Sequence, residues 1–219
     1  MVGSRLSVFE LFGAASEPAG SGLLADLGER WHLRDVSFKA WPCCHYLQGF
    51  IEAIEALRTE AGTRHLTALH CHVPVQVVPL LCLPSDRRDM PETDIDARFS
   101  LPYVVKALLL DGAIGADTFE LATRSRINAS AWPLRLSWEP WPASGFPQCY
   151  PARVDATTAD GTLLRQEIRA LRGGPDRPFS PQTLRARFFE RTQPRLGQQG
   201  ATAFWNTIAH LGAAKTVQL

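Results

Sequence analysis

Apolar residues repeat at helical spacing in two segments of the chain. In the first segment they fall at i, i+3, i+4, i+7 and i+10, on one face of a helix: Leu47, Phe50, Ile51, Ile54 and Leu57. The second segment begins at Ser100, which can cap a helix, and places Pro102 in the first turn, where proline is tolerated. Because Gly62 and Gly112 are natural stops, the pattern predicts one helix ending before each glycine.

Strand patterns lie between and after these helices. Residues 65–84 are rich in Val and Leu and are interrupted by prolines, which predicts one or two strands. Alternation of apolar residues marks a further strand at Leu134, Leu136 and Trp138. Two alternating runs joined at Asp160-Gly161 predict a β-hairpin, and Ser180-Pro181 starts the first of two C-terminal helices. Since strands and helices do not alternate regularly, we predict an α+β fold with an antiparallel sheet and flanking helices.

Composition narrows the class of protein further. The 219 residues are 45% hydrophobic and 21% charged with a formal net charge of +1, which is typical of a globular protein and does not indicate a nucleic-acid partner. The N-terminus is not typical of a secretion signal, and no apolar run approaches the roughly 18 residues of a membrane span. The odd number of cysteines, five, favours reduced thiols, so we expect a cytoplasmic protein.

One stretch, VSFKAWPCCHYLQGF from Val36 to Phe50, concentrates reactive side chains. Cys43 and Cys44 lack the C-x-x-C spacing, and no second Cys/His pair has the spacing of a zinc site, so we interpret both thiols as packing residues. Lys39 precedes a helix start, where an ammonium could help form an anion pocket or could remain on the surface.

Two histidines, His70 and His72, lie two residues apart on a predicted strand and therefore point to the same face. Such a pair can chelate a metal ion, but the sequence does not name a third ligand. A polar strand face is the commoner outcome, so we predict no metal site.

Two more polar residues flank the start of the second helix. Arg98 could donate two hydrogen bonds to a substrate carboxylate or form an ion pair with a nearby aspartate. Tyr103 could donate a proton or remain a half-buried ring. The sequence contains no nucleophile-elbow, P-loop, dinucleotide-binding or zinc-protease motif, so a nucleophilic hydrolase or a nucleotide enzyme has no support.

Three segments, taken in order, resemble the signatures of one enzyme family. They are the lysine–aromatic–proline–cysteine turn with its helix, FKAWPCCHYLQGFIEAIEAL, the segment DARFSLPYVVKALLLDG, and the hairpin YPARVDATTADGTLLRQEI followed by GGPDRPFSPQTLRARFF. Their order and spacing resemble the MmgE/PrpD family across nearly the whole chain. Members of that family dehydrate 2-methylcitrate, decarboxylate cis-aconitate or epimerise iminodisuccinate.

This resemblance implies an architecture. Family members are much longer, with an N-terminal helical domain, a smaller α+β lid-like domain, and last helices that return to the helical domain. By that pattern the chain is the C-terminal half, with a helical lead-in at residues 1–34, the lid-like domain at 35–175 and a helical segment at 176–219. The resemblance implies that a separate helical partner, or a second copy of the chain, completes the protein.

The resemblance also implies a mechanism without metal or organic cofactor. The substrate would be a small di- or tricarboxylate, and a proton would move next to a carboxylate while cationic groups hold the negative charge. Lys39 would bind the carboxylate or stabilise an enolate-like intermediate, and Tyr103 would orient substrate or relay a proton. His45 and Arg98 join the substrate-binding candidates, with His45 also a candidate for proton transfer.

Three positions depart from the family pattern. Many members carry an arginine in place of His45, a histidine in place of Gln48 and a small residue in place of Lys106. The change at Gln48 weakens the expectation of standard dehydratase chemistry, and His45 could compensate for it.

Two functional hypotheses therefore stand. In the first, the chain is the lid-bearing part of a lyase or isomerase, and large apolar residues of its terminal segments, such as Phe9 and Trp205, predict association with itself or a partner. In the second, it is a non-catalytic module that binds a carboxylate or regulates a longer relative. A third possibility, a fragment of a longer protein, predicts no different chemistry for the residues present.

Overall fold

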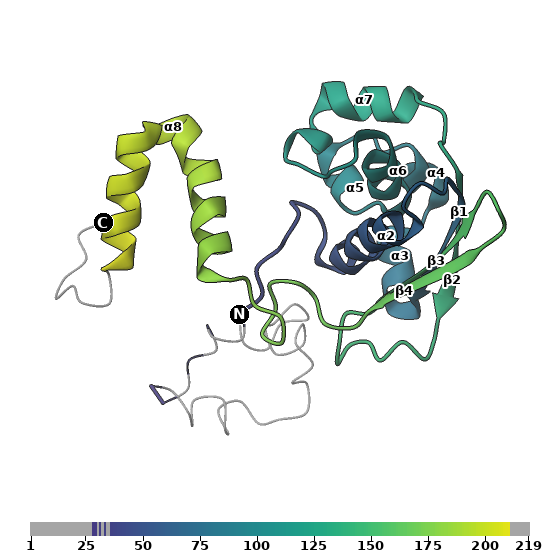
Figure 1. Cartoon of the computed structure of the whole chain (residues 1–219), viewed down its shortest axis with the longest axis horizontal. Coiled ribbons are helices and arrows are strands. Elements are labelled where there is room, and N and C mark those ends of the chain that lie inside the picture. The colour runs from purple at the N-terminus through teal and green to yellow at the C-terminus, as the bar shows by residue number, and fades with distance from the viewer. Residues whose placement is uncertain (1–27, 30, 32, 34–35, 211–219) are drawn as a thin grey trace, which may run out of the picture. The chain divides into compact units, whose positions relative to one another are not determined.

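The structure is a computed structural model that describes residues 28–29, 31, 33 and 36–210. The chain divides into two compact units, Met1–Val36 and Ser37–Leu219, and all the helices and strands labelled in Figure 1 belong to the second. The helical lead-in expected at residues 1–34 falls almost entirely outside the described residues.

The second unit combines helices with one four-stranded sheet, as the predicted α+β class requires. Its helices are α2 (Gln48–Ala61), α3 (Val78–Leu81), α4 (Ser85–Asp89), α5 (Asp94–Arg98), α6 (Leu101–Asp111), α7 (Leu121–Ala129) and α8 (Pro181–Ala209). Its strands are β1 (Leu66–Pro74), β2 (Arg135–Trp141), β3 (Ala152–Thr158) and β4 (Leu163–Ile168).

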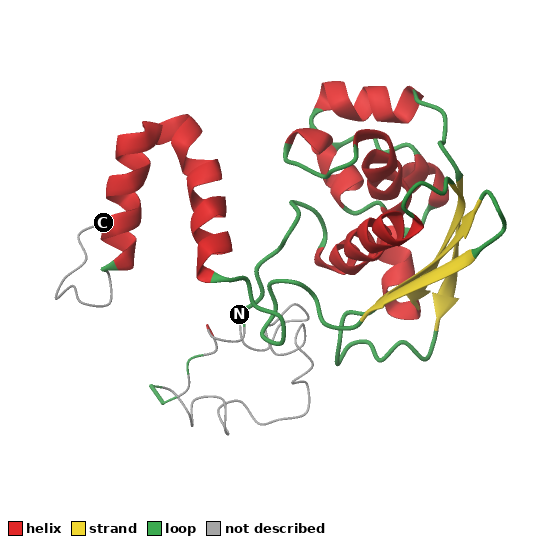
Figure 2. Cartoon of the chain, in the orientation of Figure 1, coloured by secondary structure: helices red, strands yellow, loops and turns green. Residues whose placement is uncertain are grey.

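The sheet has the strand order β2-β1-β3-β4. Figure 2 shows its strands in yellow. The expected antiparallel pairing is confirmed for β1 with β3 and for β3 with β4. It is wrong for β1 with β2, which pair in parallel. The helical segment between these two strands carries the chain back to the starting end of β1, and a connection of this length makes parallel pairing possible.

One face of the sheet is covered by α2 (Figure 1). The other face carries polar side chains. Along β1, the buried residues Leu69, Cys71 and Val73 alternate with the partly exposed His70 and His72. Since successive side chains of a strand point to opposite faces, both histidines lie on the face away from α2. The apolar face of α2 is buried as its spacing predicted, and each large side chain there contributes about 1.5–3 kcal/mol.

The Val- and Leu-rich segment from 65 to 84 forms one strand and not two. Strand β1 ends at Pro74, and the chain then turns through a 3-10 helix, Val75–Val77, into α3. Pro79 lies at the start of α3, where its fixed φ suits the first helical turn.

Helix α6 begins and ends where the sequence predicted. The Ser100 hydroxyl accepts the Tyr103 backbone N–H at 2.9 Å, and Gly112 ends the helix in the left-handed conformation with φ of 80°. Tyr103 and Lys106 are buried along with the apolar stripe, because α4, α5 and α7 pack around α6. These three helices were not predicted from the sequence.

The hairpin and the C-terminal helix also follow local signals. The Asp160 carboxylate accepts the Thr162 N–H at 3.0 Å between β3 and β4. Ser180 caps α8, which bends at Gly197, where φ is 66°, and so forms the two helical arms that were predicted (Figure 2). Ala201 is the one buried residue among the described residues of α8.

Candidate functional site

The turn before α2 is held by the side chain of Gln48. Its Oε1 accepts the backbone N–H groups of Ala40 at 2.9 Å and Trp41 at 3.0 Å. Its Nε2 donates to the Trp41 carbonyl at 3.0 Å and, at 3.4 Å, to the Cys44 carbonyl and the Cys43 sulfur. One buried amide therefore fixes the backbone of residues 40–44, a role that the sequence analysis did not assign to Gln48.

Both cysteines of this turn are buried. Burial raises the pKa of Cys43 to about 12, and burial also raises the pKa of Cys44. A protonated thiol is a poor nucleophile and a poor metal ligand, so this environment agrees with the interpretation of both cysteines as packing residues.

His45 follows the turn and is half-buried. Its ring lies edge-on to Tyr150, with ring centroids 4.9 Å apart. Burial lowers the pKa of His45, and the positive charge of Lys39 lowers this pKa further. A neutral imidazole has one nitrogen with a free lone pair, so His45 can accept a proton at neutral pH. The Lys39 side chain itself is exposed and available to an anion.

Arg98 joins this turn from the end of α5. Its guanidinium donates to the Pro42 carbonyl, while its own carbonyl accepts the Cys44 N–H at 2.9 Å. The guanidinium also lies 4.5 Å from the centroid of the Phe119 ring and is 29% exposed. The structure therefore brings Arg98 against the backbone of the turn that carries Lys39 and His45, and the charge of Lys39 acts on His45.

Tyr103, the fourth candidate, is placed differently. It is 1% exposed, and its hydroxyl donates to the Thr118 carbonyl at 2.5 Å. Burial raises the pKa of Tyr103 to about 12. A substrate could reach this hydroxyl only if the bond to Thr118 opened, so the geometry shows a structural contact for Tyr103.

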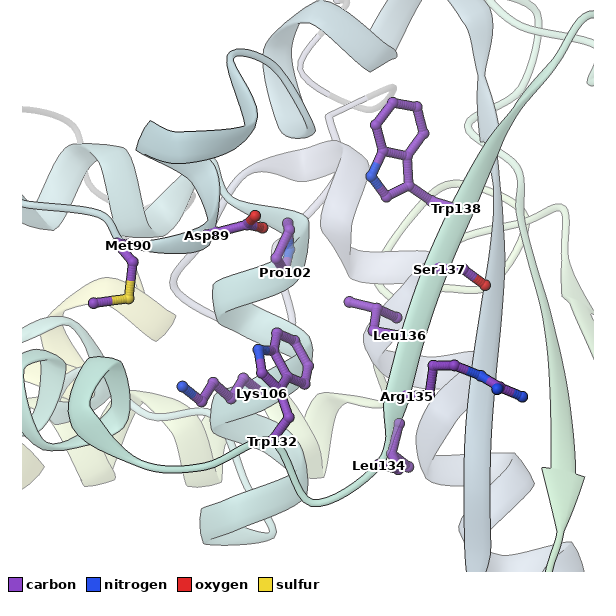
Figure 3. Close-up of a pocket in the computed structure, with 10 residues that line it drawn as sticks. All are labelled: Asp89, Met90, Pro102, Lys106, Trp132, Leu134, Arg135, Leu136, Ser137 and Trp138. Atoms are coloured by element: carbon purple, nitrogen blue, oxygen red, sulfur yellow. The ribbon is translucent and has the colours of Figure 1, made fainter.

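A separate cavity of about 510 Å³ lies between α6 and β2 (Figure 3). Its lining includes Trp132, Leu136 and Trp138, and none of the four candidate residues. At its edge Lys106 donates to the Asn128 carbonyl at 3.3 Å and lies 5.6 Å from the Trp132 ring centroid. Burial lowers the pKa of Lys106.

The fold and the turn together define a class of protein: an α+β domain with an exposed lysine and a half-buried histidine in the turn before a helix. Comparison with known proteins then identifies the family. A family model for the MmgE/PrpD C-terminal domain matches residues 41–212, so the chain belongs to that family.

Two curated relatives are similar to this chain. Cis-aconitate decarboxylase of Mus musculus is 25% identical over 158 residues, which cover 71% of this chain and 32% of the mouse protein. Cis-aconitate decarboxylase of Homo sapiens is 24% identical over 185 residues, which cover 81% of this chain and 36% of the human protein. The chain thus spans about a third of the length of the curated relatives it matches. None of the helices in the described part of the chain is long and apolar enough to cross a bilayer.

Proposed function

We propose that this chain is the lid-bearing part of a cofactor-independent lyase or isomerase that acts on a small di- or tricarboxylate. The observation that supports the proposal is the turn before α2, which resembles the family's lysine signature: its exposed Lys39 lowers the pKa of His45, and Arg98 donates to its Pro42 carbonyl. Membership of the MmgE/PrpD family and similarity to two cis-aconitate decarboxylases support the same reaction class.

The proposed chemistry follows from the charges of these three residues. Lys39 and Arg98 would each bind a carboxylate oxygen, and Arg98 would add the geometry of a planar guanidinium. The neutral His45 would take a proton next to a carboxylate, and the negative charge that then develops would be stabilised by Lys39. Tyr103 is omitted from the contacts because its hydroxyl is bonded to Thr118.

We further propose that a helical partner completes the active site. Helix α8 supports this part of the proposal, because 29 residues of helix bury one side chain among those described. Four aromatic residues stack on one another across its bend, with ring centroids 5.2–6.0 Å apart: Phe188, Phe189, Phe204 and Trp205. Phe204 remains 47% exposed and Ile208 42% exposed, which is the kind of surface that a helical partner would cover.

The test is purification of the chain with its bound proteins from the native host, followed by turnover assays on a panel of di- and tricarboxylates that includes cis-aconitate. We expect a stoichiometric helical partner, or a second copy of the chain, and turnover by the complex. Lys39→Ala should lower kcat/KM at least about a hundredfold, the loss typical of a removed charge-stabilising group. Lys39→Arg should retain part of the activity, and Arg135→Ala, which removes an exposed cation on β2, should retain all of it. Full turnover by Lys39→Ala would refute the assignment.

A non-catalytic carboxylate-binding or regulatory module is the second candidate, and Gln48 favours it. An amide cannot transfer a proton, and the five bonds of Gln48 occupy both its oxygen and its nitrogen. This candidate predicts that the purified complex binds di- or tricarboxylates without converting them, and that Lys39→Ala weakens that binding.

A further inference from the structure

Three metal-ligating side chains converge on the outer face of the sheet, away from α2. They are His70 and His72 of β1 and Glu139 of β2, and one ligand atom from each lies within 4.8 Å of the other two. The parallel register places Glu139 directly beside His72, with Oε1 2.9 Å from His72 Nδ1 and Oε2 3.6 Å from His70 Nε2. The third ligand that the sequence did not name thus comes from the parallel neighbour of β1.

A second layer of hydrogen bonds orients both imidazole rings. In the tautomer that carries its proton on Nδ1, His70 donates to the Ser137 hydroxyl at 2.8 Å, and this hydroxyl lies 3.5 Å from the Leu69 carbonyl. That bond leaves His70 Nε2 as the nitrogen with a free lone pair, on the side of Glu139. Metal-binding histidines are typically oriented by a hydrogen bond from the ring nitrogen that does not bind the metal.

His72 is oriented by a carboxylate in the same way. The Asp155 carboxylate of β3 accepts a hydrogen bond from His72 Nε2 at 2.9 Å. Asp155 also accepts a hydrogen bond from the Arg165 guanidinium. Nδ1 of His72 faces the Glu139 oxygen at 2.9 Å, and in the tautomer with one proton on Nε2 both of these atoms are acceptors. Such a pair is stable only with a cation between its members, which must be either a proton or a metal ion.

We propose that His70 Nε2, His72 Nδ1 and the Glu139 carboxylate bind a divalent transition-metal ion of the Zn²⁺ class. Two imidazoles and one carboxylate are the ligand set that such borderline ions prefer. A tetrahedral ion about 2.1 Å from each ligand holds the ligand atoms about 3.4 Å apart. Glu139 and His72 would therefore separate by about 0.5 Å, which a 55% exposed glutamate can do by a change of rotamer.

The site has an open coordination position, because three protein ligands leave the fourth to water or another ligand. Its histidines are accessible, with side chains 34% and 12% exposed for His70 and His72. The cluster lies outside the turn of Lys39 and His45, and the proposed lyase chemistry does not use it, so the two proposals can fail separately.

The test is titration of the tag-free full chain with Zn²⁺ by calorimetry and with Co²⁺ by visible absorption, after dialysis against a chelator. We expect one ion per chain and the visible bands of cobalt bound to nitrogen and oxygen ligands. His70→Ala and Glu139→Gln should each weaken Zn²⁺ binding at least tenfold and abolish the cobalt bands. Ser137→Ala keeps all three ligands and should weaken binding about tenfold, as loss of an orienting hydrogen bond does.

His65→Ala is the matched control, since His65 is an exposed histidine immediately before the same strand and outside the cluster. Its affinity for Zn²⁺ should equal that of the unsubstituted chain. Circular dichroism of each variant checks that the sheet is retained, and Glu139→Gln keeps the volume and exposure of the side chain. Absence of Zn²⁺ binding by the unsubstituted chain would show that a proton occupies the space between His72 and Glu139. That result, or equal binding by His70→Ala and Glu139→Gln, would overturn the proposal.

Discussion

Replacement of Gln48 by alanine tests whether one amide holds the turn of the candidate site. Gln48 is 2% exposed, and three of its five hydrogen bonds are 3.0 Å or shorter. At about 1 kcal/mol net for each short bond, Gln48→Ala should lower the free energy of unfolding by about 3 kcal/mol. The two bonds at 3.4 Å are long and add little to this sum. The N–H groups of Ala40 and Trp41 would lose their acceptor, so the turn that presents Lys39 should loosen as well.

The assay is urea unfolding followed by fluorescence, with thermal unfolding as a second measurement. For a chain of this size, about 3 kcal/mol corresponds to a fall of about 6–12 °C in Tm. Gln166→Ala is the control, because Gln166 makes one exposed hydrogen bond, to Glu60 at 2.9 Å, and its loss should cost less than about 0.5 kcal/mol. A cost below about 1 kcal/mol for Gln48→Ala, or one equal to that of Gln166→Ala, would refute the role of Gln48 as the organiser of the turn.

Three further predictions concern stability. Tyr103→Phe removes the hydrogen bond to the Thr118 carbonyl, so it should lower the free energy of unfolding by about 1–2 kcal/mol and leave carboxylate binding unchanged. Weaker carboxylate binding with an unchanged free energy of unfolding would instead show a substrate contact. Asp96→Asn should cost about 1–3 kcal/mol at pH 7, because the hydrogen bond from Thr93 and the charge of Arg87 hold the pKa of Asp96 below its usual range. That stabilisation is present above the ordinary carboxyl pKa and is lost as pH falls through the lowered one, so urea titrations of the two proteins should converge in acid. Gly173→Ala should cost more than about 2 kcal/mol, since an added Cβ would meet a backbone oxygen at 2.3 Å, whereas Gly161→Ala, also at positive φ but in open space, should cost about 1 kcal/mol.

Local signals account for the elements that the sequence predicted well. The cap at Ser100, the helix end at Gly112 and the turn at Asp160-Gly161 each depend on a few neighbouring residues. These elements can therefore be predicted from the local sequence alone. Helices α4, α5 and α7 have at most nine residues each and little apolar periodicity, and they exist because they pack around α6. The parallel pairing of β1 with β2 depends on long-range register, which no local pattern specifies.

The candidate site likewise contains residues that could be proposed from the sequence and residues that only the fold brings into place. Lys39, His45 and the packing of both cysteines could be proposed from residue types next to a predicted helix start. The position of Arg98 beside Pro42 could not, because the two residues are far apart in the sequence and meet only through the fold. The role of Gln48 was also missed, although a polar side chain in the first turn of a helix is a known signal for backbone bonding. Glu139 could not be matched to His72 without the register of the sheet.

The position of β1 in the sheet has a consequence for how the protein folds. Among the described residues β1 is the first strand, and it is a central one in the sheet, yet both of its neighbours, β2 and β3, lie more than sixty residues further on. The hairpin of β3 and β4 closes over a short loop and can form early, whereas the pairs of β1 must wait for long loops to close. On a ribosome, β1 would leave the exit tunnel well before either strand that pairs with it. Its exposed edges during that interval are where we expect chaperone binding and aggregation to concentrate.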